Sequence, residues 1–464
     1  MTILTLIPIL GAILLALVPD GRAARTLALG FMAGALAFTV RLALDYDAPA
    51  GGIQFTERLP WIPSLGVEYH TGADGLSLVL LLLTTFVTPF AVLAGGGAFA
   101  KVRLVLVLLL EATLIGTFTA LNFIHWFLFY ELSLVPAFLL IRSAGTQAAN
   151  RAALQFFIYT FLGGLAMLVG FLGIQLATGS FDLVFLGQVG LMMRPLLVNH
   201  FGWEHAPLVI FICVFLGLAV KVPLVPFHTW LPAAYVEAPT PVTMLLSGLM
   251  SKMGVYGFMR LLAPLFPELM VQLAWPLLAL ALLTVIFPAL AALAQTDLKR
   301  ILAYSSVNHL GYCLVGIFAM AAFPWGAPGA ASAVRNGVIL QMFNHGLTAS
   351  ALFCFVGFIE RRSGGLRGLA DFGGLRTAAP VLAGLMGIAI FSSLGLPGLN
   401  GFVGEFLIFS GTFRLAWWIP SFAAIGLFTT AVFLLNLVQK VFTGPLPARW
   451  KEFPDLTGAE TAVV

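Results

Sequence analysis

Long apolar stretches separated by short polar segments fill most of the chain. All but the first of these stretches have the roughly 20 residues that an α-helix needs to cross a bilayer. Because backbone N–H and C=O groups find no water among lipid tails, such stretches predict helices that bond these groups internally. The pattern therefore predicts an all-α polytopic membrane protein. The thirteen predicted spans lie at about 2–18, 24–44, 73–96, 102–121, 122–142, 151–177, 207–236, 239–264, 270–294, 300–322, 333–358, 379–413 and 416–440.

Two of the predicted spans are unusually long and contain helix-breaking residues. The seventh includes KVPLVPFHTWLP, where Pro223 and Pro226 cannot donate hydrogen bonds to the carbonyls of residues 219 and 222. The twelfth includes SSLGLPGLNGFVGEF, where Pro397 lies among several glycines. We expect a broken helix in each, with freed carbonyls facing protein or water.

The two interruptions lie five spans apart, and an odd offset reverses the direction in which a helix crosses the membrane. Spans four to eight and nine to thirteen are therefore interpreted as inverted five-helix units, an arrangement typical of transporters. Two unrelated proline kinks are the alternative. The predicted parts are three N-terminal helices with an outer loop at 1–101, a first unit at 102–264, an inverted second unit at 270–440 and a polar C-terminal segment at 441–464.

The composition agrees with a membrane protein and argues against a cofactor-binding one. Hydrophobic residues make up 60% of the chain and charged residues 9%, against about 25% charged in an average soluble domain. Cys213, Cys313 and Cys354 stand alone in apolar runs and are interpreted as packing residues. The sequence has no H-E-x-x-H motif, no phosphate-binding loop and no dinucleotide fingerprint, so no metal, cofactor or nucleic acid is expected.

The distribution of Lys and Arg predicts an orientation. Fifteen follow odd-numbered predicted spans and six follow even-numbered ones, while Lys221 and Lys252 lie inside spans. Because cytoplasmic loops carry the excess of these residues, we expect the N-terminus outside the cell and the first loop in the cytoplasm. The first span lacks a positive n-region and a small-residue cleavage site, so we interpret it as a retained helix.

Several ionisable residues lie within the predicted spans, where each costs about 2.5 to 3.5 kcal/mol on the insertion scale. Such groups are rare unless they are used, although a structural ion pair between helices is the alternative. For the histidines, a satisfied core position is the alternative, because imidazole titrates near neutral pH but also packs well. The candidates are Glu111, Glu131, Lys221, Lys252, His309, His345 and Glu405.

A lysine and a carboxylate at membrane depth can control a proton. At about 7 Å and an effective dielectric near 20, their attraction is worth about 2.4 kcal/mol. A change in their separation therefore changes how tightly the lysine holds its proton. A Glu–Lys pair is thus an electrostatic latch.

Four stretches together resemble one known family. The stretch KVPLVPFHTWLPAAYVEAPTPVTMLLSGLMSKMGVYGFMR closely resembles the antiporter-like core shared by respiratory complex I and Mrp-type cation/proton antiporters. DLKRILAYSSVNHLGY, LGLPGLNGFVGEF and ERLPWIPSLGVEYHTGADGLSL extend the resemblance over nearly the whole chain. Family members usually carry lysine after the second helix break, whereas those of the subunit M type carry glutamate. Glu405 therefore places the chain nearer to that type.

The resemblance implies a role for each candidate in proton translocation through two linked half-channels. Glu131 and Lys221 would form the modulating pair, and Lys252 would carry the proton along a central hydrated axis. His309 and His345 would bridge the two units, and Glu405 would release the proton. Glu111 lies mid-span as a further candidate for this pathway. Quinone and NADH chemistry would belong to other subunits.

The resemblance also implies a setting. The chain would be a multi-pass protein of the bacterial inner membrane, in contact with lipids and with membrane-arm subunits of the L and N type. An Mrp-type Na⁺/H⁺ antiporter, a membrane subunit of a hydrogenase or formate-linked complex, and a purely structural scaffold are the alternatives. The family usually has a fourteenth helix, but the residues after Lys440 are too polar to span; either the chain is short or this sequence stops early.

Overall fold

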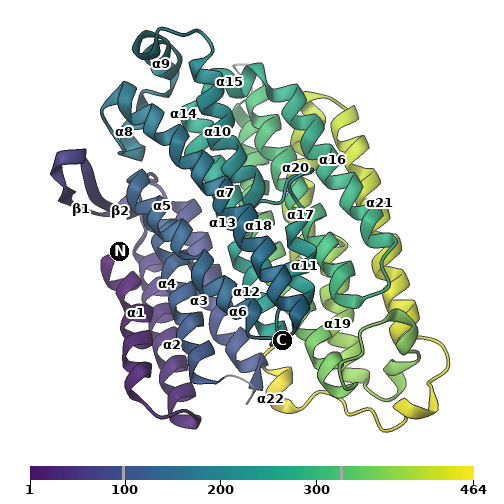
Figure 1. Ribbon diagram of the computed structural model, residues 1–464. Helices are drawn as coiled ribbons and strands as arrows, with labels where there is room; N and C mark the ends of the chain where they lie inside the picture. The colour runs from purple at the N-terminus through teal and green to yellow at the C-terminus, as the bar shows by residue number, and fades with distance from the viewer. Residues whose placement is uncertain (97–99, 324–327) are drawn as a thin grey trace. The chain divides into compact units, whose positions relative to one another are not determined.

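The computed structural model describes residues 1–96, 100–323 and 328–464, and each of the thirteen predicted spans coincides with helix there (Figure 1). Nine helices of these residues are long and apolar enough to cross a membrane. They are α2 (Arg22–Asp45), α3 (Gly75–Ala94), α4 (Lys101–Thr119), α5 with α6 (Phe123–Leu132 and Leu134–Arg142), α7 (Gln147–Thr178), α16 (Ala274–Leu293), α17 (Leu298–Ala322), α18 (Pro328–Arg362) and α21 (Trp418–Phe442). The all-α polytopic fold is thereby confirmed, apart from one β-hairpin.

The other four predicted spans are shorter or interrupted. The first is α1 (Thr2–Leu17), which is apolar but short. The seventh divides into α10 (Ala206–Lys221) and α11 (Trp230–Glu237). The twelfth divides into α19 (Pro380–Ser393) and α20 (Asn400–Leu415), and between them Gly395 and Gly398 adopt φ of 68° and 97°. Both helix breaks predicted from proline and glycine are confirmed.

The eighth predicted span is helical, but two π-helical turns interrupt its α-helical hydrogen bonding. After α12 (Thr240–Leu245) the backbone forms a π-helical turn at Leu246–Met250 and a second at Phe258–Leu262. Between them lies α13 (Lys252–Gly257), and α14 (Ala263–Leu265) and α15 (Pro267–Gln272) follow. π-Helical turns are rare and often mark functional positions, so they single out the segment that carries Lys252.

The chain divides into two compact units. The first comprises Met1–Pro89, Gly97–Pro223 and Leu249–Pro276, and the second Phe90–Gly96, Leu224–Gly248 and Leu277–Val464. Helices α11 and α12 therefore belong to the second unit, although their neighbours in sequence belong to the first.

Small residues let α7 and α10 approach closely in the first unit. A Cβ on Gly217 of α10 would lie 2.7 Å from the carbonyl oxygen of Gly163 of α7, so only glycine fits there. The opposite face of α7 exposes Leu162, Val169 and Leu176 at seven-residue intervals. An exposed apolar stripe opposite a close-packed glycine face is the pattern expected of a helix between protein and lipid.

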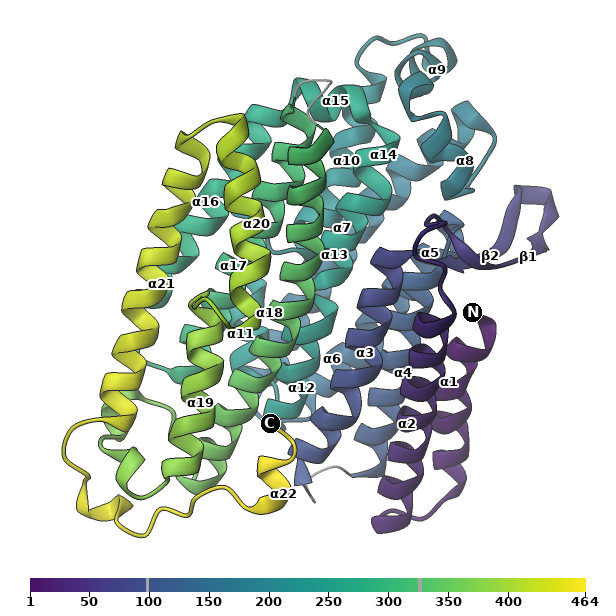
Figure 2. The same ribbon diagram turned by 180° about the vertical axis from the view of Figure 1, so that it is seen from behind.

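The second unit has the same kind of contact between α18 and α20, which lie side by side (Figure 2). A Cβ on Gly337 would lie 2.9 Å from the carbonyl oxygen of Gly404. A Cβ on Gly404 would lie 2.8 Å from the backbone nitrogen of Gln341. The backbones of α18 and α20 are therefore held at a fixed close distance, and their side chains meet in a defined register.

Part of the segment expected as an outer loop is an antiparallel hairpin of β1 (Gln54–Ile62) and β2 (Val67–Ala73). His70 Nδ1 lies 2.7 Å from Asp182 Oδ2, and this contact ties β2 to the segment before α8 (Leu183–Gln188). Burial would raise the pKa of Asp182, but hydrogen bonds from His70 and the Phe185 N–H, with the charge of Arg58, lower it overall. The hairpin is therefore anchored through an ionised carboxylate.

The segment expected as a loop before α10 also contains unpredicted helices, α8 and α9 (Met193–Phe201). With the turn that precedes it, α9 meets α10 at an angle of 117°.

The polar segment after α21 packs against the second unit and ends in α22 (Gly458–Thr461). Asp455 accepts hydrogen bonds from the N–H groups of Val381 and Leu382 at 2.8 and 2.9 Å. These are among the donors that the first turn of α19 cannot satisfy within the helix. Asp455 therefore caps α19 from a distant part of the chain, and Glu460 adds an ion pair with Arg362 at 2.5 Å.

Candidate functional site

The seven ionisable residues predicted within the spans fall into two groups. Six are buried and Glu131 is half-buried. The first unit contains Glu111, Glu131, Lys221 and Lys252, and the second contains His309, His345 and Glu405.

Lys221 is the last residue of α10, at the point where the first broken helix ends. Its ammonium group lies 4.5 Å from the ring centroid of Tyr130 and 3.4 Å from Ser133 Oγ. Both partners flank Glu131 in sequence, at the junction of α5 and α6. The lysine is thus held by a π-face and a hydroxyl, neither of which carries a formal charge.

Glu131 forms no salt bridge within 4 Å of Lys221, and its two carboxylate oxygens accept no hydrogen bond from the residues that the structure describes. The carboxylate packs against Gly164 of α7, where a Cβ would lie 1.9 Å from Oε1. Glu131 and Lys221 therefore interact through space and not through a salt bridge. Glu111, in the middle of α4, is also buried without a hydrogen bond from the described part of the chain.

Lys252 begins α13, directly after the first π-helical turn. It is fully buried, and its ammonium group donates to Ser251 Oγ at 3.3 Å. The close packing of α13 against the end of α10 fixes its position, because a Cβ on Gly254 would lie 2.4 Å from Val222 Cγ2. Lys252 is thus carried on a locally distorted helix that packs against the first helix break.

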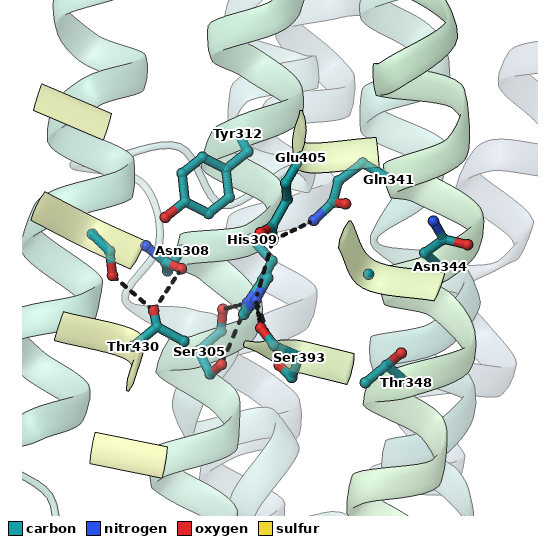
Figure 3. Close-up of polar contacts among 12 residues, drawn as sticks. Ser305, Asn308, His309, Tyr312, Gln341, Asn344, Thr348, Ser393, Glu405 and Thr430 are labelled. Carbon is teal, nitrogen blue, oxygen red and sulfur yellow. Dashed lines mark hydrogen bonds and ion pairs between the residues drawn. The ribbon is translucent and has the colours of Figure 1, made fainter. Parts of the chain in front are cut away.

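In the second unit, His309 of α17 contacts two backbone carbonyls. Its Nδ1 lies 2.7 Å from the oxygen of Ser305, and its Nε2 lies 3.0 Å from the oxygen of Ser393 (Figure 3). A carbonyl oxygen only accepts hydrogen bonds, so both contacts are hydrogen bonds only when both ring nitrogens carry a proton. The geometry therefore fits the doubly protonated imidazolium.

The carbonyl of Ser393 is available because of the second helix break. In a continuous α-helix its oxygen would accept from the N–H of residue 397, and that residue is Pro397, which has none. The expectation that the break frees a carbonyl to face protein is met at this position. The same proline that ends α19 thereby supplies a partner for His309.

Glu405, in the second turn of α20, lies beside His309. Its Oε1 is 3.7 Å from His309 Nε2 and accepts a hydrogen bond from Gln341 Nε2 at 3.1 Å (Figure 3). The imidazolium of His309 can donate a proton, and the carboxylate of Glu405, which Gln341 holds in place, can accept it. The contacts between these side chains can therefore pass a proton at membrane depth.

His345 of α18 stacks on His309, with ring centroids 5.4 Å apart and an interplanar angle of 18°. Both rings line a small cavity with Ser305, Ser306 and Ser393. The wall is mixed, since hydroxyl and imidazole groups alternate with apolar side chains, so a water there would find polar partners. The structure thus brings His309, His345 and Glu405 into one cluster.

The uncharged partners in both groups were not predicted from the sequence: Tyr130, Ser133, Ser305, Gln341 and Ser393. Four of them lie near a predicted residue in sequence. Tyr130 and Ser133 flank Glu131, Ser305 precedes His309 by one helical turn, and Gln341 precedes His345 by one turn. Two other histidines, near the ends of predicted spans, pack on aromatic rings: His125 on Tyr69 at 4.7 Å and His228 near Phe287 at 6.0 Å.

Known proteins match the part of the chain that contains the candidate residues other than Glu111. The family described as "NADH:quinone oxidoreductase/Mrp antiporter, TM" matches residues 120–432. NADH-quinone oxidoreductase subunit M of Rickettsia conorii is 36% identical over 413 residues, which cover 88% of this chain and 79% of the relative. Subunit M of Rhodobacter capsulatus is also 36% identical, over 479 residues that cover all of this chain and 90% of the relative.

Two solved structures share the fold. A chain of respiratory complex I from Thermus thermophilus superimposes with a TM-score of 0.85 at 30% identity, covering 99% of this chain and 92% of that one. A chain of the Mrp complex from Dietzia superimposes with a TM-score of 0.82 at 22% identity, covering 96% of this chain and 80% of that one. The second likeness shows the fold alone. The family match and the curated relatives show that this chain belongs to the NADH:quinone oxidoreductase/Mrp antiporter membrane family.

Proposed function

We propose that this chain translocates protons as a membrane-arm subunit of an NADH-quinone oxidoreductase. It would be the counterpart of its curated relatives, which are subunit M of that complex. Electron transfer would take place in other subunits, and this chain would use the energy to move protons. The relatives at 36% identity and the complex I structure at 30% identity support this assignment over an Mrp-type antiporter, for which the likeness is one of fold.

The observation that carries the proposal is the His309–Glu405 pair at the second helix break. A purely structural scaffold has no need of an imidazolium that faces a carboxylate inside the protein, because burying each charge costs several kcal/mol. A proton carrier needs such a pair, since the proton must pass between two groups that can each hold it. The pair's contacts with Ser393 and Gln341 hold the two groups in place.

Within this scheme each unit has a distinct task. In the first, the charge of Glu131 tunes how tightly Lys221 holds its proton, Glu111 adds a second carboxylate to the same unit, and Lys252 carries the proton onward. In the second, His309 and His345 receive the proton and Glu405 releases it. The two inverted five-helix repeats would provide the two half-channels for these tasks.

The proposed setting is the bacterial inner membrane, with the N-terminus outside the cell, as the excess of Lys and Arg in odd-numbered loops favours. The exposed apolar side chains of helices such as α7 would face lipid. Subunits of the L and N type are the proposed neighbours in the complex.

Two variants of Glu405 test the proposal in an assembled complex. Quinone-linked NADH oxidation and proton uptake into vesicles are measured for Glu405→Gln and Glu405→Lys. We expect Gln to impair pumping at least about tenfold, and Lys to retain part of it because a titratable group remains. Normal pumping by Glu405→Gln would refute the proposed release site. Pumping that required sodium would favour the antiporter alternative.

A further inference from the structure

Gln341 occupies a position that the proposed pathway does not yet use. Its side chain is 1% exposed, and its Nε2 donates to Glu405 Oε1 at 3.1 Å. Its Oε1 is equally buried and has no hydrogen-bond partner among the residues that the structure describes. A buried acceptor without a hydrogen bond destabilises the fold, so this amide oxygen is expected to have a function.

The backbone holds Gln341 against Glu405. Residues 341 and 345 are one helical turn apart, so α18 presents Gln341 and His345 on one face. Gln341 meets Glu405 (Figure 3). His345 meets His309 through its ring. Gly404 provides the space, because a Cβ there would lie 2.8 Å from Gln341 Oε1. The amide therefore lies in a pocket made by a glycine, next to the residue proposed to release the proton.

An amide is suited to a partner that changes its protonation state. An ionised carboxylate only accepts hydrogen bonds, whereas a protonated carboxyl group also donates one. The amide of glutamine has a donor on one side and an acceptor on the other, and a half-turn about its last side-chain bond exchanges them. The same residue can therefore bond Glu405 in either state.

We infer that Gln341 is a positioning residue that holds Glu405 in both of its protonation states, by donating Nε2–H to the carboxylate and by accepting the carboxyl O–H at Oε1. This inference rests on the proposed function of Glu405 and adds a residue to it. The inference rests on the geometry of this buried amide. Its Nε2 donates to Glu405, and its Oε1 has no hydrogen-bond partner among the described residues.

The proton transfer that this requires is balanced. The imidazolium of His309 loses the proton on Nε2, and a carboxylate oxygen of Glu405 gains it, directly or through one water. The products are a neutral imidazole and a neutral carboxylic acid. The amide of Gln341 then turns, so that its oxygen accepts the new O–H, and it turns back when Glu405 releases the proton.

The test uses Gln341→Met in the assembled complex, because methionine has a similar length and volume but neither donates nor accepts strongly. We expect redox-driven proton pumping to fall about tenfold, the effect of losing a hydrogen bond to a charged group. In pH-induced infrared difference spectra, the C=O band of protonated Glu405 should move to higher frequency, because its O–H has lost an acceptor. The band is assigned by its absence in Glu405→Gln.

A matched control and a second variant complete the design. Gln295→Met makes the same change at the end of α16, where the amide donates to the carbonyl of Ala291, and it should leave both readouts unchanged. If Gln341→Met assembles poorly, Gln341→Glu is used in its place, because glutamate keeps the length and polarity of the side chain. It can accept from protonated Glu405 but, once ionised, cannot donate to it, so we expect about a tenfold loss of pumping here too.

The outcomes separate this inference from the proposed function. If Gln341→Met or, should it not assemble, Gln341→Glu pumps normally while Glu405→Gln does not, the role of Gln341 is refuted and the function stands. An unshifted Glu405 band in Gln341→Met would refute it as well. If Glu405→Gln itself pumps normally, the proposed release site is refuted.

Discussion

The two units hold their buried ionisable groups in different ways. In the first unit, Lys221 meets a hydroxyl and an aromatic ring, and the carboxylate of Glu131 has no hydrogen bond from the described residues. In the second, His309 and Glu405 lie 3.7 Å apart, and each is hydrogen-bonded to the surrounding protein. The first group is thus controlled by charge at a distance, and the second by contact.

This difference has a physical consequence. A through-space interaction varies gradually with distance, so small helix movements in the first unit change the proton affinity of Lys221 by degrees. A hydrogen bond is lost within a few tenths of an ångström, so the bonds from His309 to the Ser393 carbonyl and from Gln341 to Glu405 are made or broken in a more nearly on–off manner. The tasks proposed for the two units would suit these two modes of control, tunable for uptake and two-state for release.

The largest expected effect is a loss of proton pumping in Glu131→Gln without a loss of folding stability. Glu131→Gln should reduce pumping at least about tenfold, because it removes the charge that tunes Lys221. It should leave the free energy of unfolding within about 0.5 kcal/mol, because no hydrogen bond is lost and a buried charge is removed. Glu405→Gln should instead lower stability by about 1 to 3 kcal/mol, because His309 loses its facing carboxylate.

Unfolding of the purified protein in detergent, followed by circular dichroism, measures the second quantity for both variants. Equal losses of stability would show that Glu131 has contacts as strong as those of Glu405, and the distinction between the two units would be wrong.

A smaller effect is expected from Gly164→Ala. The added methyl group would lie 1.9 Å from Glu131 Oε1, and the flexible carboxylate would move aside. We expect pumping to fall a few-fold with a stability loss of about 1 kcal/mol, because the Glu131–Lys221 distance changes while both charges remain. Gly384→Ala is the control, since a Cβ at Gly384 meets nothing within 4 Å. Unchanged pumping in Gly164→Ala would show that the distance does not matter.

The smallest effect concerns the hairpin of the first unit. The lowered pKa of Asp182 means that its ionised form stabilises the hairpin above the ordinary carboxyl range, and this contribution is lost as pH falls through the lowered value. Hydrogen exchange of hairpin amides should therefore be faster in Asp182→Asn than in the parent at pH 7. Once the pH falls below this lowered pKa, the two should converge. A difference that persisted at low pH would refute the ionised anchor.

The sequence was sufficient for features that local chemistry determines. Pro223, Pro226 and Pro397 remove backbone donors wherever they occur, so both helix breaks were predictable. The π-helical turns on either side of α13 were not, because no local sequence motif marks them. The hairpin was not predicted because Pro60 lies within β1, and Pro63 and Gly66 lie in the turn that follows, which together resemble a loop in sequence.

The site was predictable to a similar extent. Glutamates, lysines and histidines stand out in apolar spans because they are costly there. Their neutral partners do not stand out, and Gln341 lies 64 residues from Glu405 in sequence. Only the close approach of α18 and α20, which glycines permit, brings that amide to the carboxylate.

The cap that Asp455 places on α19 gives the C-terminal tail a mechanical role. One end of this 14-residue helix is held by the tail, and the carbonyl of Ser393 at the other end holds His309. A helix of this length is a stiff rod of about 21 Å, so a pull on one end displaces the other almost undiminished. A tag, a crosslink or a neighbouring subunit that shifted the tail would thus change the position of the Ser393 carbonyl against the His309 imidazole.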